Sequence, residues 1–170
     1  MAKVSSTRVT RSRPPSEAVQ WSRATLRQSR AAAELDAGEL TSSALVQRHL
    51  AGSRVVKAFN NIDFHRLLTS ARPAGAADRS ALPIAGDDAA AKAEVAGLLG
   101  LLGYDVVDIG PLAESWRSQP DTPVYVDPYV VPRPQGELSQ EDAYRWFETP
   151  GVPVPAGRVR ELAAAARRPG

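Results

Sequence analysis

The segment "ALPIAGDDAAAKAEVAGLLGLLGYDVVDIG", residues 81–110, constrains the fold more than any other part of the chain. Ala81 to Ala85 form a short apolar run, which predicts a strand. Asp87 or Asp88 can cap the helix that follows, whose apolar residues recur at helical spacing until a glycine ends it. "YDVVDIG" predicts a second strand. Strand, helix and strand within about thirty residues form a βαβ crossover, so the strands are predicted to be parallel or to share one mixed sheet.

The remaining patterns complete an α/β prediction. Residues 54–59, "RVVKAF", favour a strand because β-branched and aromatic side chains dominate. A proline-rich segment and two helical patterns follow the second strand of the crossover. We therefore predict a Rossmann-like sheet remnant over residues 34–118, followed by a mainly helical part over residues 119–170. A Pro-rich extended arm and two C-terminal helices make up that second part.

The basic charge of the chain is concentrated at its start. Residues 1–30 hold seven Lys or Arg and one Glu, whereas residues 31–170 hold fourteen basic and eighteen acidic side chains. Residues 1–33 are therefore predicted to be a basic, disordered leader. An out-of-frame reading of GC-rich sequence would give such a composition, and a native tail is the alternative. Nucleic-acid binding is not expected, because the arginines form no regular helical stripe.

Composition also argues against several classes of site. The chain has no cysteine, so it has neither a disulfide framework nor a thiolate metal site, which suits the cytoplasm. No signal peptide or membrane-spanning apolar run is visible. Asp87 and Asp88 have no third metal ligand nearby, and His49 and His65 form no metal motif. We expect no metal and no catalytic side chain of the acid–base type.

Three motifs carry a resemblance to a known family. "RVVKAFNNI", "LPIAGDDAAAKAEV" and "YDVVDIGPLAES", in this order, resemble the second half of the deazaflavin (coenzyme F420)-dependent NADP reductases, over about residues 34–170. The resemblance implies hydride transfer between NADP(H) and a second redox partner, a deazaflavin or a small carbonyl compound. It also implies the last strands of a Rossmann domain and a small domain that closes over that partner.

The resemblance implies candidate cofactor contacts at two places. The asparagine pair is expected beside the nicotinamide and deazaflavin rings, with small Ala58 on the same strand face as Asn60, and the Gly-Pro-Leu turn is expected to flank the deazaflavin pocket. The candidates are Ala58, Asn60, Asn61, Gly110, Pro111 and Leu112. The alternatives are that the asparagines cap the next helix or form a turn, and that Gly-Pro is an ordinary turn after a strand.

The chain departs from the family in one respect. It contains no GxGxxG turn, whose glycines let the backbone approach a pyrophosphate at a helix N-terminus. We therefore expect a C-terminal portion of such a reductase that binds no cofactor tightly by itself. The alternatives are a non-catalytic remnant and a small binding module that uses the Pro-Tyr arm. A homodimer is possible for either.

Overall fold

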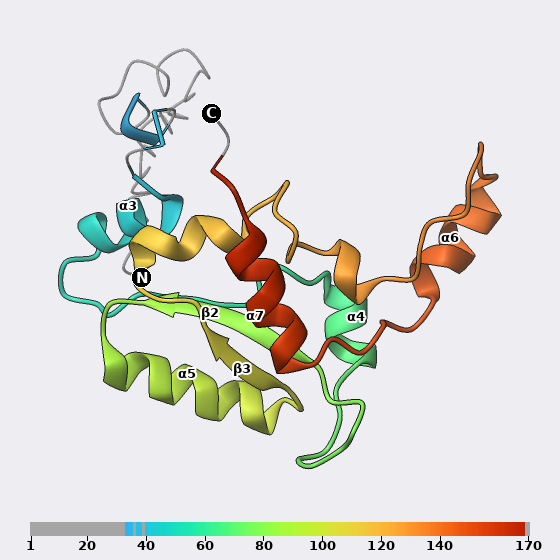
Figure 1. Ribbon diagram of the computed structural model, residues 1–170, viewed down its shortest axis with the longest axis horizontal. Helices are drawn as coiled ribbons and strands as arrows, with labels where there is room; N and C mark the ends of the chain where they lie inside the picture. The colour runs from blue at the N-terminus through green and yellow to red at the C-terminus, as the bar shows by residue number, and fades with distance from the viewer. Residues whose placement is uncertain (1–32, 36, 39, 169–170) are drawn as a thin grey trace, which may run out of the picture.

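The computed structural model describes residues 33–35, 37–38 and 40–168, so the predicted leader lies almost wholly outside the described residues. The described part is a small mixed β-sheet with helices on both faces (Figure 1), which confirms the predicted α/β class. The strand order is β1-β2-β3, in which β1 runs antiparallel and β3 parallel to the central strand. The strands are β1 (Val56–Lys57), β2 (Ala81–Gly86) and β3 (Asp105–Asp108).

The predicted crossover is confirmed as β2, α5 (Ala89–Leu101) and β3, and its two strands are parallel. The Asp88 carboxylate begins the helix by accepting a hydrogen bond from the Ala91 amide at 2.7 Å. Gly103 follows the last turn with a φ of +96°, a conformation that favours glycine. Both ends of α5 therefore lie where local chemistry predicts them.

Strand β1 is shorter than the sequence predicts. Of the predicted strand over residues 54–59, only two residues pair with β2, the last being Lys57 opposite Ala85. Continuing that register would place Phe59 opposite Pro83, which has no amide hydrogen to donate. The backbone instead turns at Phe59, whose φ is +62°.

Helices cover both faces of the sheet. Helix α5 packs on one face, and α7 (Ala156–Ala165) packs against β2 and β3 on the other (Figure 1). The 3-10 helix η1 (Leu112–Ser118) lies between α7 and α3 (Ser42–His49). The Thr41 hydroxyl caps α3 and also donates to the Leu112 carbonyl at 2.8 Å, which joins α3 to η1.

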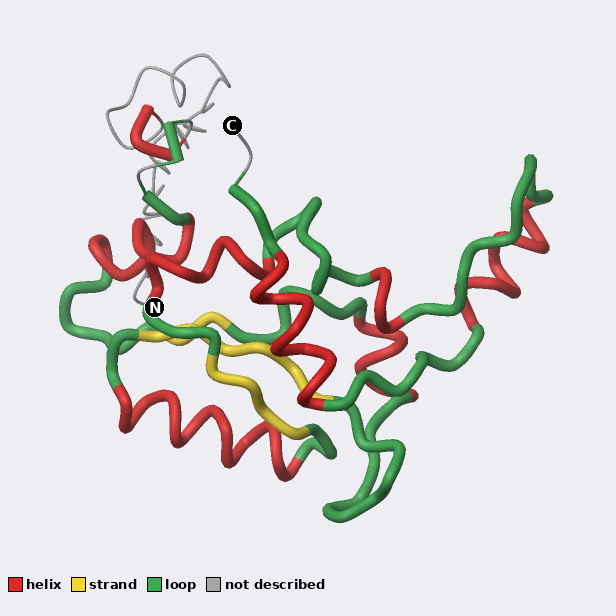
Figure 2. Tube along the Cα trace, viewed as in Figure 1, coloured by secondary structure: helices red, strands yellow, loops and turns green. Residues whose placement is uncertain are grey.

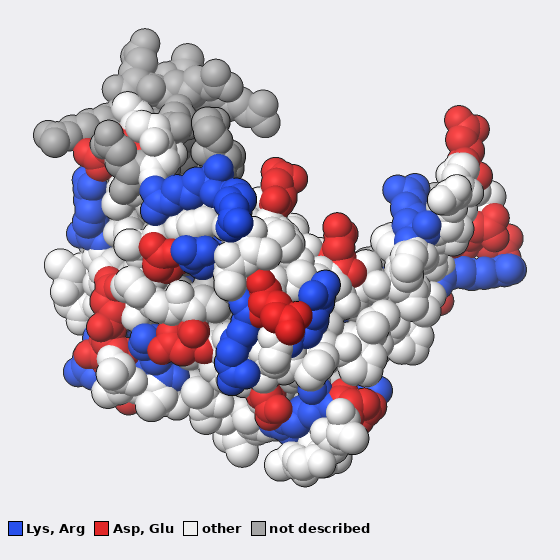
Figure 3. Space-filling view, in the orientation of Figure 1, with Lys and Arg blue, Asp and Glu red and all other residues white. Residues whose placement is uncertain are grey.

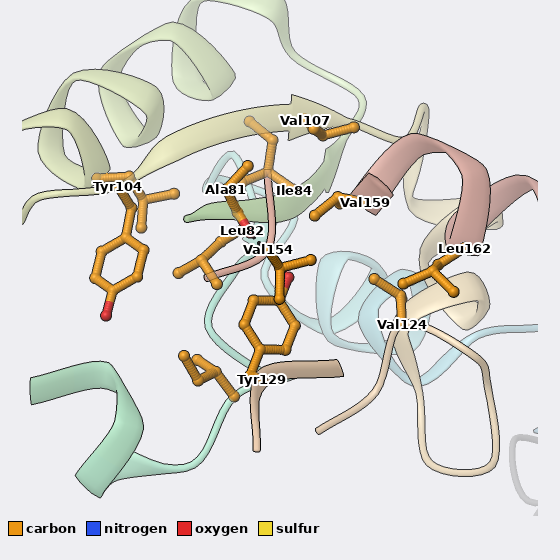
Figure 4. Close-up of a cluster of buried hydrophobic side chains, with 12 residues drawn as sticks. Ala81, Leu82, Ile84, Tyr104, Val107, Val124, Tyr129, Val154, Val159 and Leu162 are labelled. Atoms are coloured by element: carbon orange, nitrogen blue, oxygen red, sulfur yellow. Dashed lines mark hydrogen bonds between the residues drawn. The ribbon is translucent and has the colours of Figure 1, made fainter. Parts of the chain in front are cut away.

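The hydrophobic core collects side chains from segments far apart in sequence (Figure 4). Val124 and Tyr129 are fully buried, although they come from the Pro-rich segment that was predicted to be an extended surface arm. The Tyr129 hydroxyl donates to the Ala81 carbonyl at 2.8 Å, next to the 3-10 turn η2 (Asp127–Tyr129). The prediction of an arm on the surface is therefore wrong for Val124 and Tyr129, whose side chains are buried in the hydrophobic core.

The part of the segment beyond residue 131 does project from the body. Figure 2 shows it as loop running to α6 (Gln140–Glu148), which extends away from the sheet in Figure 1. Helix α4 (Phe64–Thr69) lies at its base. There the buried Arg66 guanidinium donates to the Trp146 carbonyl at 2.9 Å and lies 5.0 Å from the Phe147 ring centre. The buried Arg66 therefore helps to tie α6 to the body, together with the contact of 2.9 Å between the His65 ring and the Glu148 carbonyl oxygen.

Candidate functional site

The two candidate asparagines point in different directions. Asn60 is exposed, and its amide nitrogen donates to the Ser118 carbonyl at 3.0 Å. Asn61 is only 1% exposed, and its amide nitrogen lies 3.4 Å from the Val124 carbonyl oxygen. Its carboxamide oxygen has no hydrogen-bond partner within the described part of the chain. Only Asn60 presents its side chain to a ligand at the surface.

Two strained residues bracket this pair. Phe59, immediately before Asn60, has a φ of +62°, and Val126 has a φ of +54°. The Val126 amide donates to the Asn61 carbonyl at 3.0 Å, so both strained positions adjoin the asparagines. Positive φ is uncommon for non-glycine residues and costs about 1–3 kcal/mol, most clearly for β-branched valine. Strain of this size persists only where surrounding structure holds it, and it clusters at ligand sites.

Ala58 does not sit as an alternating strand would place it. The turn at Phe59 ends the alternation after β1, so the predicted shared face of Ala58 and Asn60 is wrong. Ala58 is half-buried and packs against the hydrophobic core. Its proposed contact with a cofactor ring stays a prediction.

The glycine–proline turn is built from backbone contacts. Gly110 has a φ of +110°, and its carbonyl accepts a hydrogen bond at 3.0 Å from the amide of Gly86, at the end of β2. Pro111 is exposed and precedes η1. Leu112 is 1% exposed, and its amide donates to the Asp87 carboxylate at 2.9 Å. Gly110 and Pro111 thus lie at the surface side of the turn, whereas the Leu112 side chain belongs to the interior.

The 3-10 helix η1 separates the two groups of candidates. Asn60 contacts Ser118 at its end, and Gly110 and Pro111 precede its start. A 3-10 helix rises roughly 2 Å per residue, so the two places lie about 12 Å apart along η1. The structure therefore places the candidates along one seam, not at one point, and a ligand touching both must be elongated.

Lys57 lies in the middle of this seam and was missed by sequence reasoning. Its ammonium donates to the Ser115 carbonyl at 2.8 Å, and no salt bridge joins it to a carboxylate of the described residues. Burial lowers the pKa of Lys57 to about 8. Lys57 is one of only three lysines in the chain and directly precedes the candidate residues in "KAFNN". This position in the sequence could have identified it as a further candidate.

An open hollow of about 530 Å³ lies on the loop over residues 120–127, and one residue that lines it, Val126, donates its amide to the Asn61 carbonyl. Tyr125 and two prolines line it, together with the strained Val126 and the carboxylates of Asp121 and Asp127. A flat ring can lie against such a surface, and an uncharged or cationic ring suits its two carboxylates. Phosphate groups do not suit them.

The aspartates and histidines take structural roles. Asp88 caps α5 and Asp87 holds the turn before η1. His49 bonds to the carbonyl of its own helix at Leu45, and His65 lies 2.9 Å from the Glu148 carbonyl oxygen. Within the described residues there is no group of three side chains suited to hold a metal ion. Among the same residues, no helix is both long and apolar enough to cross a membrane.

Comparison with known proteins gives two partial matches, and no protein-family model matches the chain. The "Putative protein YjhV" of Escherichia coli (strain K12) is 42% identical over 64 residues, which are 38% of this chain and 43% of that protein. A crystal structure of a "putative F420 dependent NADP-reductase" from Arthrobacter sp. FB24 is 38% identical. That match covers 43% of this chain and 32% of that one, with a TM-score of 0.37. The chain spans less than half the length of either protein that it matches.

Proposed function

We propose that the chain carries one side of a hydride-transfer site that works between NADP(H) and a deazaflavin or similar planar redox partner. The observation that carries the proposal is the strained backbone at Phe59 and Val126, which brackets the asparagine pair. A simple turn does not need strain on both sides. The motifs that resemble the reductases supply the chemistry, and the strain supports a ligand site at the same place.

Positioning is the task that such a site must perform. When bound, the two cofactors supply the hydride donor and acceptor themselves, and the protein needs only to hold their rings close in a dry pocket. Asn60 suits this role because the Ser118 carbonyl fixes its amide nitrogen, which leaves its carboxamide oxygen to accept from a ring N–H. The residues present fit the ring part of a cofactor and not its phosphates.

Binding of the full chain tests the proposal directly. In ¹⁵N nuclear magnetic resonance (NMR), a 5-deazaflavin is expected to shift the amides of Asn60, Gly110 and Val126. The Asn60→Leu variant should bind about tenfold or more weakly, since one or two positioning hydrogen bonds are worth about 1–3 kcal/mol. Its melting temperature should fall only slightly, because Asn60 is exposed and the variant loses one hydrogen bond, to the Ser118 carbonyl. Gln140→Leu, on α6, is the matched control and should bind as the natural chain does.

A rate measurement completes this test. In a chain joined to a glycine-rich dinucleotide-binding unit, Asn60→Leu should lower the rate of hydride transfer by roughly 10–100-fold. If the variant loses stability but keeps full turnover, the asparagines are structural residues of a turn and take no part in hydride transfer.

A second candidate function is a binding or dimerisation module, and the projecting α6 favours it. None of its residues is buried, and Tyr144 is 61% exposed. Tyr144→Ser should then lower the association of two chains in sedimentation equilibrium, without affecting deazaflavin binding. A chain that is monomeric with or without Tyr144 would remove the dimer version of this candidate.

A further inference from the structure

A second hollow lies between β3, η1 and α7. Its volume is about 350 Å³, within the range of small-ligand sites. The walls are aliphatic and come from the end of β3 and the last turns of α7: Val107, Ile109, Ala163 and Ala164. None of the six candidate cofactor residues lines this hollow.

One guanidinium at the hollow is held rigidly. The Arg117 Nε donates to the Glu114 carboxylate at 2.7 Å, and one terminal nitrogen donates to the Ala163 carbonyl at 3.2 Å. The same guanidinium lies 4.5 Å from the Trp116 ring centre. The other terminal nitrogen makes no hydrogen bond to a described residue. Arg117 therefore binds a carbonyl at the C-terminal end of α7, where the helix dipole is negative. Its other terminal nitrogen is held in place and can still donate a hydrogen bond to a ligand.

Among the residues that line the hollow and their ion-pair partners, one positive charge is unbalanced. Arg117 pairs with Glu114, and Asp108, at the rim, pairs with Lys92 at 2.6 Å. Arg160 also lines the hollow and makes no ion pair with a described residue. The surplus is one unit, and the two carboxylates nearby repel a ligand with two negative charges. Figure 3 shows acidic and basic side chains intermixed over this face, which is unlike the broad basic surface of a nucleic-acid binder.

We infer that this hollow binds a small monocarboxylate with a short apolar body. The carboxylate lies between the free donor of Arg117 and the guanidinium of Arg160, because guanidinium groups match carboxylate geometry. The apolar body lies against Ala164 and the aliphatic walls. The site is independent of the hydride-transfer proposal, since it shares no residue with it and its test measures binding alone.

Titration of the full chain with isobutyrate tests this inference. The amides of Ile109, Ala163 and Ala164 and the Arg117 Nε–H should shift saturably in ¹⁵N NMR, with a dissociation constant on the order of 1–10 mM for so small a probe. Isobutyramide, the uncharged analogue of similar shape, should bind at least tenfold more weakly. Inorganic phosphate that binds as tightly as isobutyrate would overturn the assignment, and so would equal binding of the amide.

Variants with a matched control locate the site. Arg160→Met keeps the aliphatic stem, removes the unbalanced charge and should weaken isobutyrate binding at least fivefold. Ala164→Leu should abolish binding by filling the hollow, and Ala164 is exposed, so the fold tolerates the change. Arg158→Met, on the same helix, removes an arginine that pairs with Glu161 and should leave binding unchanged. The inference fails if Arg160→Met binds like the natural chain, or if Arg158→Met weakens binding equally.

Discussion

At the scale of single residues, Lys57 gives the molecule a distinct dependence on pH. Burial lowers its pKa from about 10.5 to about 8. Between these values the unfolded chain binds more protons than the folded chain, so the free energy of unfolding rises as the pH increases from about 8 to 10. Urea unfolding followed by circular dichroism should show this rise. In Lys57→Met it should be absent.

The control for this prediction is Lys92→Met. Lys92 forms an ion pair with Asp108 and is the other lysine of the described residues, so its variant should keep the rise in stability above pH 8. A profile of the natural chain that is flat from pH 8 to 10 would show that the Lys57 ammonium is better solvated than its position indicates.

The candidate residues show what sequence can and cannot locate. The motif indicates an asparagine pair, but only the turn at Phe59 decides that Asn60 faces outward and Asn61 inward. No propensity predicts a phenylalanine with positive φ, because this conformation is held by tertiary contacts. Lys57 was missed for a similar reason, since its burial depends on η1, some sixty residues later in the chain.

At the scale of elements, the end of α5 depends on the close approach of another segment. A Cβ at Gly103 would lie 2.8 Å from the Arg72 backbone nitrogen, and φ there is +96°. Gly103→Ala should therefore lower the free energy of unfolding by about 2–4 kcal/mol. Gly100→Ala, inside the same helix and with open space at its Cβ, should raise it by about 0.5–1 kcal/mol. Chemical denaturation of both variants shows whether the close approach of Arg72 and the positive φ require glycine at position 103.

The attachment of α6 gives another prediction at this scale. Arg66 is 1% exposed and donates to the Trp146 carbonyl. Arg66→Met should release α6, so its amides should exchange hydrogen at least tenfold faster while those of β2 change little. Arg145→Met removes an exposed arginine of α6 and should leave exchange unchanged. If β2 loses protection equally in Arg66→Met, Arg66 stabilises the whole fold and not one attachment.

Local patterns predicted most elements well, and long-range contacts explain the exceptions. The crossover over residues 81–110 was visible because its caps and periodicity are local signals. Strand β1 was predicted too long because Pro83, opposite it, removes the donor that a longer ladder needs. The burial of Val124 and Tyr129 could not be predicted, since proline-rich composition favours exposure and only the assembled core shows the space they fill.

At the scale of the whole molecule, the chain contains no GxGxxG turn to hold a pyrophosphate. The full chain should therefore bind NADP weakly, with a dissociation constant of about 1 mM or higher. Isothermal titration calorimetry measures this directly, and nicotinamide mononucleotide, which has one phosphate, serves as the comparison. Micromolar affinity for NADP would show that the chain does hold the pyrophosphate, by residues other than a glycine-rich turn.

Strand β3 ends the sheet on one side, and no described strand pairs with its outer edge. Unpaired amides and carbonyls of this kind can recruit a strand from a neighbouring molecule, which begins aggregation. Here Asp105 and Asp108 stand at the two ends of the strand, both exposed, and each holds a basic side chain beside it. A very short edge strand with charged side chains at both ends is one of the ways in which natural sheets avoid edge-to-edge pairing.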